Sequence, residues 1–224
     1  PSFSKFFEKL VYNRLINYLT KFSILYEHQY GFRSNLSTSL AILEMVEKIT
    51  DAIDSNKFSV GIFIDLSKAF DTINHKILIN KLEFYGIRGI ALNWFISYLS
   101  NRQQYVLFNG TASSRLPVTC GVPQGSILGP ILFLLYINDI VNVSPLLHFI
   151  LFADDTNIFM SHRDLPTLIR TLNVELKLLS TWFIANKLSL NIDKTHFIIF
   201  RGVRKRNSSD TVLSDKLVIE DKPI

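Results

Sequence analysis

The sequence predicts an α/β fold of the α+β type, with an antiparallel or mixed sheet backed by helices on one face. Three observations lead to this prediction: a short, almost uninterrupted apolar run at 58–64, hairpin patterns at 103–118 and 149–160, and amphipathic stretches around them. Hairpins require antiparallel neighbours, whereas the interleaved helices need a sheet face to pack on.

The first amphipathic stretch runs over 36–53, where apolar residues recur every three or four positions. This spacing predicts a helix, and Ser37 or Asn35 is placed to cap its start. The apolar run at 58–64 follows and predicts a buried strand. Because that strand ends at Asp65, it presents a carboxylate at its carboxyl end.

The central part of the chain alternates helical and strand-like patterns. A helix is expected over 72–85, with Asp71 as a possible cap and Gly86 as a stop. The dipeptide at 109–110 is Asn-Gly between two strand-like runs, which is the strongest local hairpin signal. The remaining expected elements are a helix over 90–99, a helix that Ser126 can cap and that runs to about Ile140, strands over 149–153 and 157–160, a helix over 165–183 and a last clear strand over 197–200.

Composition narrows the class of protein. The 224 residues are 48% apolar and 12% aromatic, enough for one compact unit or two intimate subdomains. The net charge of +5 suits a phosphate-bearing partner, although many basic proteins never bind nucleic acid. The single cysteine, Cys120, excludes an internal disulfide and points to a reducing compartment.

The uncharged segment 116–138 contains glycines and prolines that would break a membrane helix, so we expect no membrane partner. No signal peptide is visible, so we expect an intracellular protein.

Three carboxylates stand at the ends of apolar strands. Asp154 and Asp155 occupy a hairpin tip, where aspartate is also an ordinary turn residue, and Asp65 ends a second buried strand. Carboxylates that converge at one sheet edge repel one another unless a divalent cation neutralises them, and magnesium is the natural occupant. Two such ions support nucleotidyl transfer, but other metal phosphotransferases use the same acids. The five histidines show no ligand spacing, and we assign them no metal.

Three motifs follow one another along the chain, the first at 63–71, the second at 121–130 and the third at 152–155. Together they resemble the reverse transcriptase domain of non-LTR (LINE-type) retrotransposons. Their order, spacing and identities all match the family pattern, and further similarity covers 4–9, 29–33 and 190–195. The third motif begins with Phe152. Many reverse transcriptases have tyrosine at this position, but phenylalanine is usual in the LINE-type branch.

The resemblance implies a right-hand polymerase palm with part of the fingers and no thumb. It implies partial fingers and connecting helices at 1–57, and a palm at 58–224 with a finger-side insertion around 72–118. We expect the chain to stop before the primer grip, so that this segment alone is inactive or weakly active.

The resemblance also implies the roles of individual residues. Asp65, Asp154 and Asp155 would be the catalytic acids, and together with the backbone carbonyl of Leu66 they would hold two Mg²⁺ ions, with Mn²⁺ as a possible substitute. Lys194 would protonate or neutralise pyrophosphate. The implied substrate-binding residues are Phe70 under the incoming sugar, Gly121, Pro123, Gln124 and Gly125 along the nucleotide and template, and Arg33 on the fingers side.

The implied function is RNA-directed DNA polymerase, with an RNA template, a DNA primer and dNTPs as partners. The full-length parent would act within a ribonucleoprotein in the nucleus and cytoplasm. One alternative is a catalytically inert or domesticated fragment that binds RNA. A second alternative is a group II intron maturase or a viral RNA-copying enzyme, which the residues at 68–71 disfavour.

Overall fold

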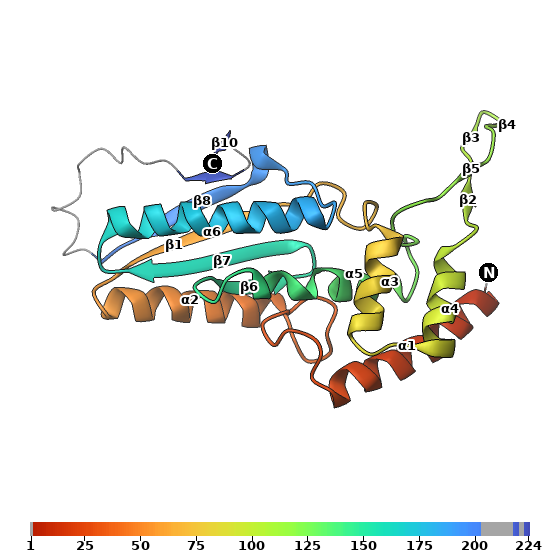
Figure 1. Cartoon of the computed structure of the whole chain (residues 1–224), viewed down its shortest axis with the longest axis horizontal. Coiled ribbons are helices and arrows are strands. Elements are labelled where there is room, and N and C mark those ends of the chain that lie inside the picture. Colours follow the sequence, from red (N-terminus) through yellow and green to blue (C-terminus); the bar gives the residue numbers. More distant parts are fainter. Residues whose placement is uncertain (1, 203–216, 220–221) are drawn as a thin grey trace. The chain divides into compact units, whose positions relative to one another are not determined.

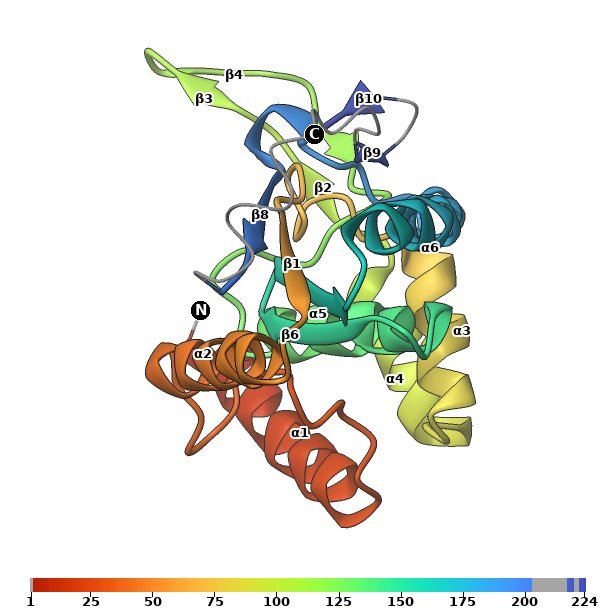
Figure 2. The same ribbon diagram turned by 90° about the vertical axis from the view of Figure 1, so that its left-hand side faces the viewer.

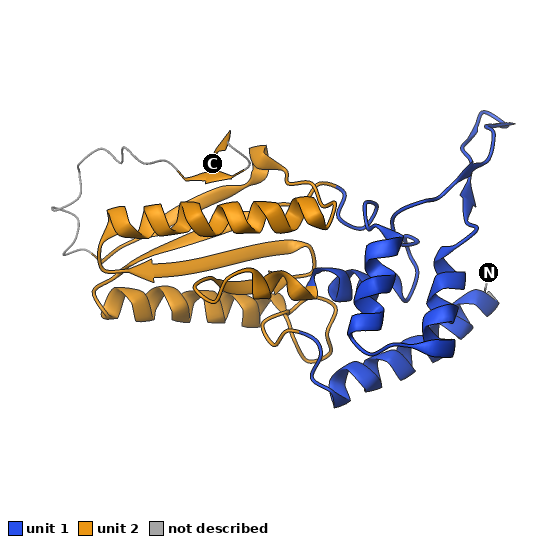
Figure 3. Cartoon of the chain, in the orientation of Figure 1, with its two compact units in different colours: residues 1–25, 68–137 blue, residues 26–67, 138–224 orange. Residues whose placement is uncertain are grey.

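The computed structural model describes residues 2–202, 217–219 and 222–224, and it divides into two compact units. Unit 1 comprises residues 1–25 and 68–137, and unit 2 comprises 26–67 and 138–224 (Figure 3). Each unit therefore contains segments that are distant in the sequence. The assignment of fingers and palm to particular residues stays a prediction. Part of the predicted palm, at 203–216 and 220–221, lies outside the described residues.

Unit 2 is built on a four-stranded antiparallel sheet (Figure 1). Its strands are β1 (Phe58–Ile64), β6 (His148–Phe152), β7 (Asp155–His162) and β8 (His196–Phe200), in the order β6-β7-β1-β8. Strand β1 has the bounds that the apolar run predicts, and it pairs with β7 on one side and β8 on the other. The predicted α+β class is confirmed, and no parallel pair occurs among these four strands.

Helices cover both faces of this sheet, so the expectation of helices on one face is wrong. Helix α2 (Thr38–Asp54) packs through Ala41 and Met45 against Ile150 and Phe159. Helix α6 (Leu165–Ala185) lies on the opposite side of the strands, as Figure 2 shows, and buries a row of leucines. Side chains along a strand alternate between its faces, and six of the seven residues of β1 are buried, so this strand packs on both faces.

Unit 1 is mainly helical. Its core contains α5, whose residues from Ile131 to Ile137 are all buried. Lys81 of α3 donates its ammonium to the Tyr136 carbonyl at 2.6 Å, which ties α3 to α5. The elements are α1 (Ser2–Lys21), α3 (His75–Phe84), α4 (Gly89–Leu99), α5 (Gly129–Ile137) and the short strands β2 (Gln103–Gln104), β3 (Leu107–Phe108), β4 (Thr111–Ala112) and β5 (Leu116–Pro117).

Two helix starts differ from the sequence-based expectation. Helix α3 begins at His75 under a cap from Asn74, because the side chain of Asp71 accepts a hydrogen bond from Gln124 instead. Helix α5 begins at Gly129, later than a cap at Ser126 places it, but the Ser126 hydroxyl accepts a hydrogen bond from Gly129 N–H at 2.9 Å as the predicted capping side chain would. After residue 137 the chain tightens into the 3₁₀ helix η1 (Asn138–Val143).

The structure also contains elements that periodicity did not reveal. They are helix α1, the 3₁₀ turn η2 (Ile192–Lys194) and two short paired strands, β9 (Val218–Ile219) and β10 (Lys222–Pro223). Within the described ranges, no helix combines the length and apolar character needed to cross a bilayer.

Candidate active site

The backbone around Asp65 is fixed by the segment that precedes β8. Asp65 follows the last residue of β1, and its carbonyl accepts a hydrogen bond from Asn191 N–H at 2.9 Å. Ser67 N–H donates to the Ser189 carbonyl at 2.8 Å, and Leu66 between them is buried. The Asp65 carboxylate is therefore carried on an ordered backbone at the end of an interior strand.

The second pair of acids lies at the tip of the β6–β7 hairpin. Phe152 pairs with Asp155, which leaves Ala153 and Asp154 as the two turn residues. Ala153 has a φ of 56°, a left-handed conformation that costs an L-residue about 1–2 kcal/mol. The turn is therefore strained, and contacts from elsewhere in unit 2 must hold it.

Gln29 provides one of those contacts. Its side chain is 1% exposed, and its Oε1 accepts hydrogen bonds from Ala153 N–H at 3.0 Å and Gly31 N–H at 2.8 Å. The neighbouring backbone runs beside β6, with Tyr30 N–H donating to the Leu151 carbonyl at 2.7 Å. The segment around Gln29 thus holds the acidic turn from one side.

Gly31 provides a second contact through its lack of a side chain. A Cβ at this position would overlap the backbone nitrogen of Ala153, and it would lie 3.0 Å from the Ala153 Cβ. The φ of Gly31 is not among the positive values, so close approach is the reason for a glycine here.

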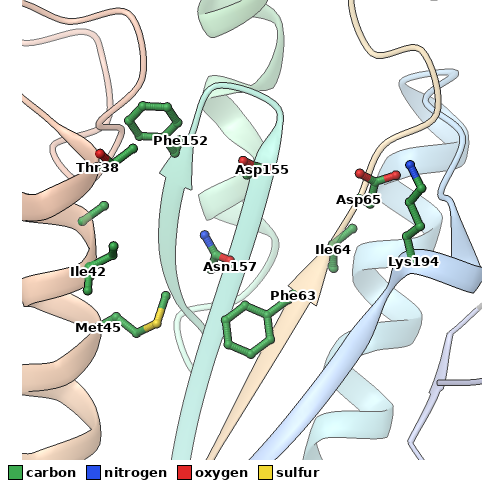
Figure 4. Close-up of a pocket in the computed structure, with 11 residues that line it drawn as sticks. Thr38, Ile42, Met45, Phe63, Ile64, Asp65, Phe152, Asp155, Asn157 and Lys194 are labelled. Atoms are coloured by element: carbon green, nitrogen blue, oxygen red, sulfur yellow. The ribbon is translucent and has the colours of Figure 1, made fainter.

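A pocket of about 290 Å³ opens beside these acids within unit 2. Asp65, Asp155 and Lys194 contribute its charged groups, and Figure 4 shows the Lys194 side chain beside Asp65. The rest of the lining is Thr38, Ala41, Ile42, Met45, Phe63, Ile64, Phe152 and Asn157. Two acids and a lysine thus meet beside an apolar wall to which α2, β1 and β6 all contribute.

The electrostatics of the acids fit a cation. Burial raises the pKa of Asp155, and the neighbouring carboxylates of Asp154 and Asp65 raise it further. A divalent cation between such carboxylates removes their repulsion, and carboxylate oxygens are the ligands that a hard ion prefers. Among the described residues, one group of three metal-binding side chains has all its ligand atoms within 4.8 Å of one another, and it consists of His28, Glu44 and His148. The carboxylate oxygens of the three aspartates lie farther apart than this.

Arg33 binds its own loop in this structure. Its Nη1 donates to the carbonyls of Tyr26 at 2.7 Å, Glu27 at 3.3 Å and Gln29 at 3.1 Å. Burial lowers the pKa of its guanidinium. These contacts support the segment that carries Gln29, and the predicted contact of Arg33 with template or triphosphate stays a prediction.

The remaining predicted site residues lie together in unit 1. Val122 N–H donates to the Phe70 carbonyl at 3.0 Å, and Gln124 Nε2 donates to Asp71 at 2.9 Å. Gly121 has a φ of 81°, and a Cβ there would come within 2.7 Å of the Asp71 carbonyl. Loop 121–126, which includes Pro123 and Gly125, thus lies against the segment that carries Phe70.

The Phe70 ring is half-buried and packs on Phe133, with ring centroids 4.6 Å apart. Gln124 and Gly125 are exposed, and an added Cβ at Gly125 would meet no atom within 4 Å. The loop therefore presents an exposed amide and open backbone to solvent, which suits contact with an extended ligand.

Two features of unit 2 escaped sequence reasoning. The similarity at 29–33 contained Gln29 and Gly31, but no local rule gave either a role, because their partner Ala153 is distant in the sequence. The expectation that the histidines are scattered is wrong for His28 and His148, since both contact Glu44. Sequence spacing cannot find ligands that only the tertiary fold brings together.

Comparison with protein families gives a match over almost the whole chain. The family model described as reverse transcriptase (RNA-dependent DNA polymerase) matches residues 2–214. The resemblance inferred from the three motifs is therefore confirmed, and enzymes of this family generally use divalent metal ions.

Two curated relatives come from Drosophila melanogaster. The probable RNA-directed DNA polymerase from transposon X-element is 37% identical over 139 residues, covering 62% of this chain and 15% of that protein. The RNA-directed DNA polymerase from mobile element jockey is 27% identical over 207 residues, covering 89% of this chain and 22% of that protein. The chain thus spans between 15% and 22% of the length of these relatives.

Among solved structures, apo telomerase from Candida tropicalis has a similar fold. The TM-score is 0.64 at 14% identity, and the match covers 85% of this chain and 36% of that chain. At this identity the likeness concerns the fold, and it supports the predicted palm-like architecture.

Proposed function

Since this chain belongs to the reverse transcriptase family, we propose that it supplies the polymerase active site of a non-LTR retrotransposon protein. The reaction is RNA-directed DNA synthesis, in which a primer 3′-hydroxyl attacks a dNTP and pyrophosphate leaves. The observation that carries this proposal is the placement of Asp65 at the end of β1, next to strand β7, which begins at Asp155 and follows Asp154 in the turn.

We propose that two magnesium ions, for which Mn²⁺ can substitute, are held by Asp65, Asp154 and Asp155 with the Leu66 carbonyl. The pKa of Asp155 is raised first by burial and then by the carboxylates of Asp154 and Asp65, and the second of these contributions supports the assignment because a bound cation would offset it. When bound, such ions lower the pKa of the attacking hydroxyl and stabilise the charge on the leaving pyrophosphate.

The other residues have roles that follow from the family resemblance. Lys194, which lines the same pocket as Asp65, is proposed to neutralise or protonate pyrophosphate. Phe70 is proposed to exclude a 2′-hydroxyl from the incoming sugar. Loop 121–126 is proposed to contact the nucleotide and template, and Arg33 to act near the template.

The proposed partners are an RNA template, a DNA primer and dNTPs. A net charge of +5 supports partners that carry phosphates. We propose that the longer protein works inside the cell, within a ribonucleoprotein in the nucleus and cytoplasm.

A primer-extension assay on an RNA template tests the assignment of the acids. The assay uses a chimera in which this chain replaces the matching segment of the Drosophila melanogaster jockey polymerase. Asp65→Asn or Asp154→Asn should lower DNA synthesis about 100-fold or more, because each removes a carboxylate that no other residue replaces. Asp51→Asn, which changes an exposed carboxylate of α2, is the matched control and should leave synthesis unchanged.

The same assay separates the polymerase from an inert RNA-binding fragment. A polymerase loses synthesis but keeps RNA binding when Asp65 is changed, since the phosphate contacts come from other side chains. RNA binding by the unaltered chimera without any DNA synthesis would favour the inert fragment.

The role of Phe70 has its own test in the chimera. Phe70→Ala should raise the ribonucleotide to deoxynucleotide ratio of kcat/KM about tenfold or more, because the ring no longer blocks the 2′-hydroxyl. Phe84→Ala removes a ring that is 81% exposed in the same unit and should leave the ratio unchanged. An unchanged ratio in both variants reduces Phe70 to a packing residue.

A further inference from the structure

Three side chains from separate parts of unit 2 converge away from the acidic turn. His28 precedes Gln29, Glu44 lies on α2, and His148 begins β6. His28 Nδ1 is 2.8 Å and His148 Nε2 is 2.7 Å from the same carboxylate oxygen, Oε1 of Glu44. All three side chains are largely covered, with exposures of 28%, 11% and 24%.

The convergence has the character of a ligand set. Two imidazole nitrogens and one carboxylate oxygen bind zinc in sites that keep a fourth position for water. Imidazole favours zinc and other transition metals, whereas magnesium prefers oxygen ligands. This chemistry differs from that of the aspartates at the hairpin tip.

Two of the atoms that face away from the shared Glu44 oxygen also have partners. The Tyr30 hydroxyl donates to the second carboxylate oxygen of Glu44, and Glu27 lies 3.3 Å from Nε2 of His28. In metal sites the histidine nitrogen that does not bind the ion commonly bonds a carboxylate, which fixes the ring. Both histidine rings are also held by edge contacts, with the centroid of the His28 ring 4.9 Å from that of His148 and 5.2 Å from that of Tyr26.

We propose that His28, Glu44 and His148 form a zinc site that joins the segment around residue 28, helix α2 and strand β6. This site is distinct from the proposed polymerase centre, and it does not depend on that proposal. Ligand bonds of about 2.0–2.1 Å in a tetrahedron place ligand atoms about 3.3 Å apart, so each ring nitrogen moves about half an ångström from the Glu44 oxygen.

The rival interpretation is a cluster in which both imidazoles simply donate hydrogen bonds to Glu44. Zinc titration of the purified chain after treatment with a chelator separates the two. We expect one equivalent of zinc to bind the unaltered chain, and Glu44→Gln and His148→Ala to abolish this binding. His162→Ala, which removes an exposed histidine of the same unit, should retain it.

A second control separates this site from the proposed polymerase centre. Asp65→Asn should keep the full equivalent of zinc, even though it is expected to abolish DNA synthesis. Loss of zinc binding in Asp65→Asn, with binding retained in Glu44→Gln, would place the ion on the aspartates and overturn the proposal.

Cobalt(II) gives a readout that needs no variant. Bound to two histidines, a carboxylate and water in a tetrahedron, cobalt absorbs visible light far more strongly than six-coordinate cobalt does. Strong absorption that saturates at one equivalent and disappears on addition of zinc is expected. Weak absorption, or none, would show that the cluster is only a set of hydrogen bonds.

Thermal unfolding guards against a variant that fails to fold. With zinc at about 100 times its Kd, the midpoint of the unaltered chain should rise about 5–10 °C. Glu44→Gln keeps the shape of the side chain and should unfold cooperatively in chelator at a similar midpoint, but without any rise in zinc. An equal rise in both proteins would contradict the assignment.

Discussion

The two hairpins of this protein are held by different means. The hairpin at 103–118, in unit 1, turns at Asn109 and Gly110, both with positive φ, and its strands are exposed. The β6–β7 hairpin, in unit 2, turns at Ala153 and Asp154 without a glycine, and its strands are largely buried. The first turn is specified by its own residues. The second depends on Gln29 and Gly31, which hold a strained backbone from outside the hairpin.

This difference separates a turn that only reverses the chain from one that must place acids. A locally favoured turn would have Gly, Asn or Asp at its left-handed position, whereas the acidic turn has Ala153 there and carries its carboxylate on the next residue. The cost of the left-handed Ala153 is offset by hydrogen bonds and close packing from residues 29–31. Substitutions that act on each hairpin separately test this contrast.

The largest effect is expected for Gly31→Ala. The added methyl overlaps the backbone of Ala153, so the turn or the segment around residue 31 must shift, at a cost of about 3 kcal/mol. Gly110→Ala is the matched control, because a Cβ there meets no atom within 4 Å and only the positive φ penalises it, by about 1 kcal/mol. Denaturant unfolding of both variants measures the difference, and equal losses would remove the contrast between the hairpins.

Gln29→Leu should have the next largest effect. It leaves the N–H groups of Gly31 and Ala153 without their buried acceptor, which costs about 2 kcal/mol of the free energy of unfolding. Synthesis by the jockey chimera should also fall, since the acidic turn is no longer held. Gln104→Leu changes an exposed glutamine of the other hairpin and should stay within about 0.5 kcal/mol.

Measuring the activity of Gln29→Leu at a temperature where it is fully folded shows whether Gln29 positions the acidic turn or only stabilises the fold. If Gln29 only stabilises the fold, then chimera activity should return to its normal level at a temperature where the variant is fully folded. A persistent loss of kcat under those conditions supports a positioning role, and full recovery contradicts it.

The sequence predicted the elements whose signals are local. Strand β1 was found because every residue from 58 to 64 is apolar or small, and α2 because its periodicity and the Ser37 cap agree. The start of α3 was placed too early, since Asp71 serves Gln124 rather than the helix. Helices on both sheet faces were also missed, because an apolar strand does not say how many helices it supports.

The residues of the candidate site also fall into those with a local sequence signal and those without one. The three acids, Lys194 and the loop at 121–126 stand in recognisable motifs, and the structure gives each an ordered setting within its own unit. Gln29 and the histidine cluster have no local pattern. His28 and His148 are far apart in the sequence, and only the folding of unit 2 brings them to Glu44.

The smallest effect is expected for Asp155→Asn, and its sign is the opposite of the others. The pKa of Asp155 is raised in the folded protein, first by burial and then by Asp154 and Asp65. A raised carboxyl pKa means that the folded state binds the proton more tightly than the unfolded state does. The resulting stabilisation is present below the ordinary pKa of aspartate and is lost as pH rises through the raised value.

At pH 7 the ionised Asp155 therefore opposes folding, and Asp155→Asn should raise the free energy of unfolding. The carboxylate is only partly covered and much of the residue remains accessible to solvent, so solvent screening limits the gain to less than about 1 kcal/mol. The gain should shrink as pH falls through the raised pKa, because the wild-type carboxyl then takes up its proton.

Magnesium should also reduce the gain, since it stabilises the wild-type acids more than the variant. The hairpin at 103–118 has no acidic residue, so no substitution there can raise the free energy of unfolding by removing a buried or repelled carboxylate. Denaturant unfolding at pH 7 and below pH 4, with and without magnesium, measures these differences, and a variant less stable than the wild type at pH 7 would contradict the cost that burial and the neighbouring carboxylates are inferred to place on ionised Asp155.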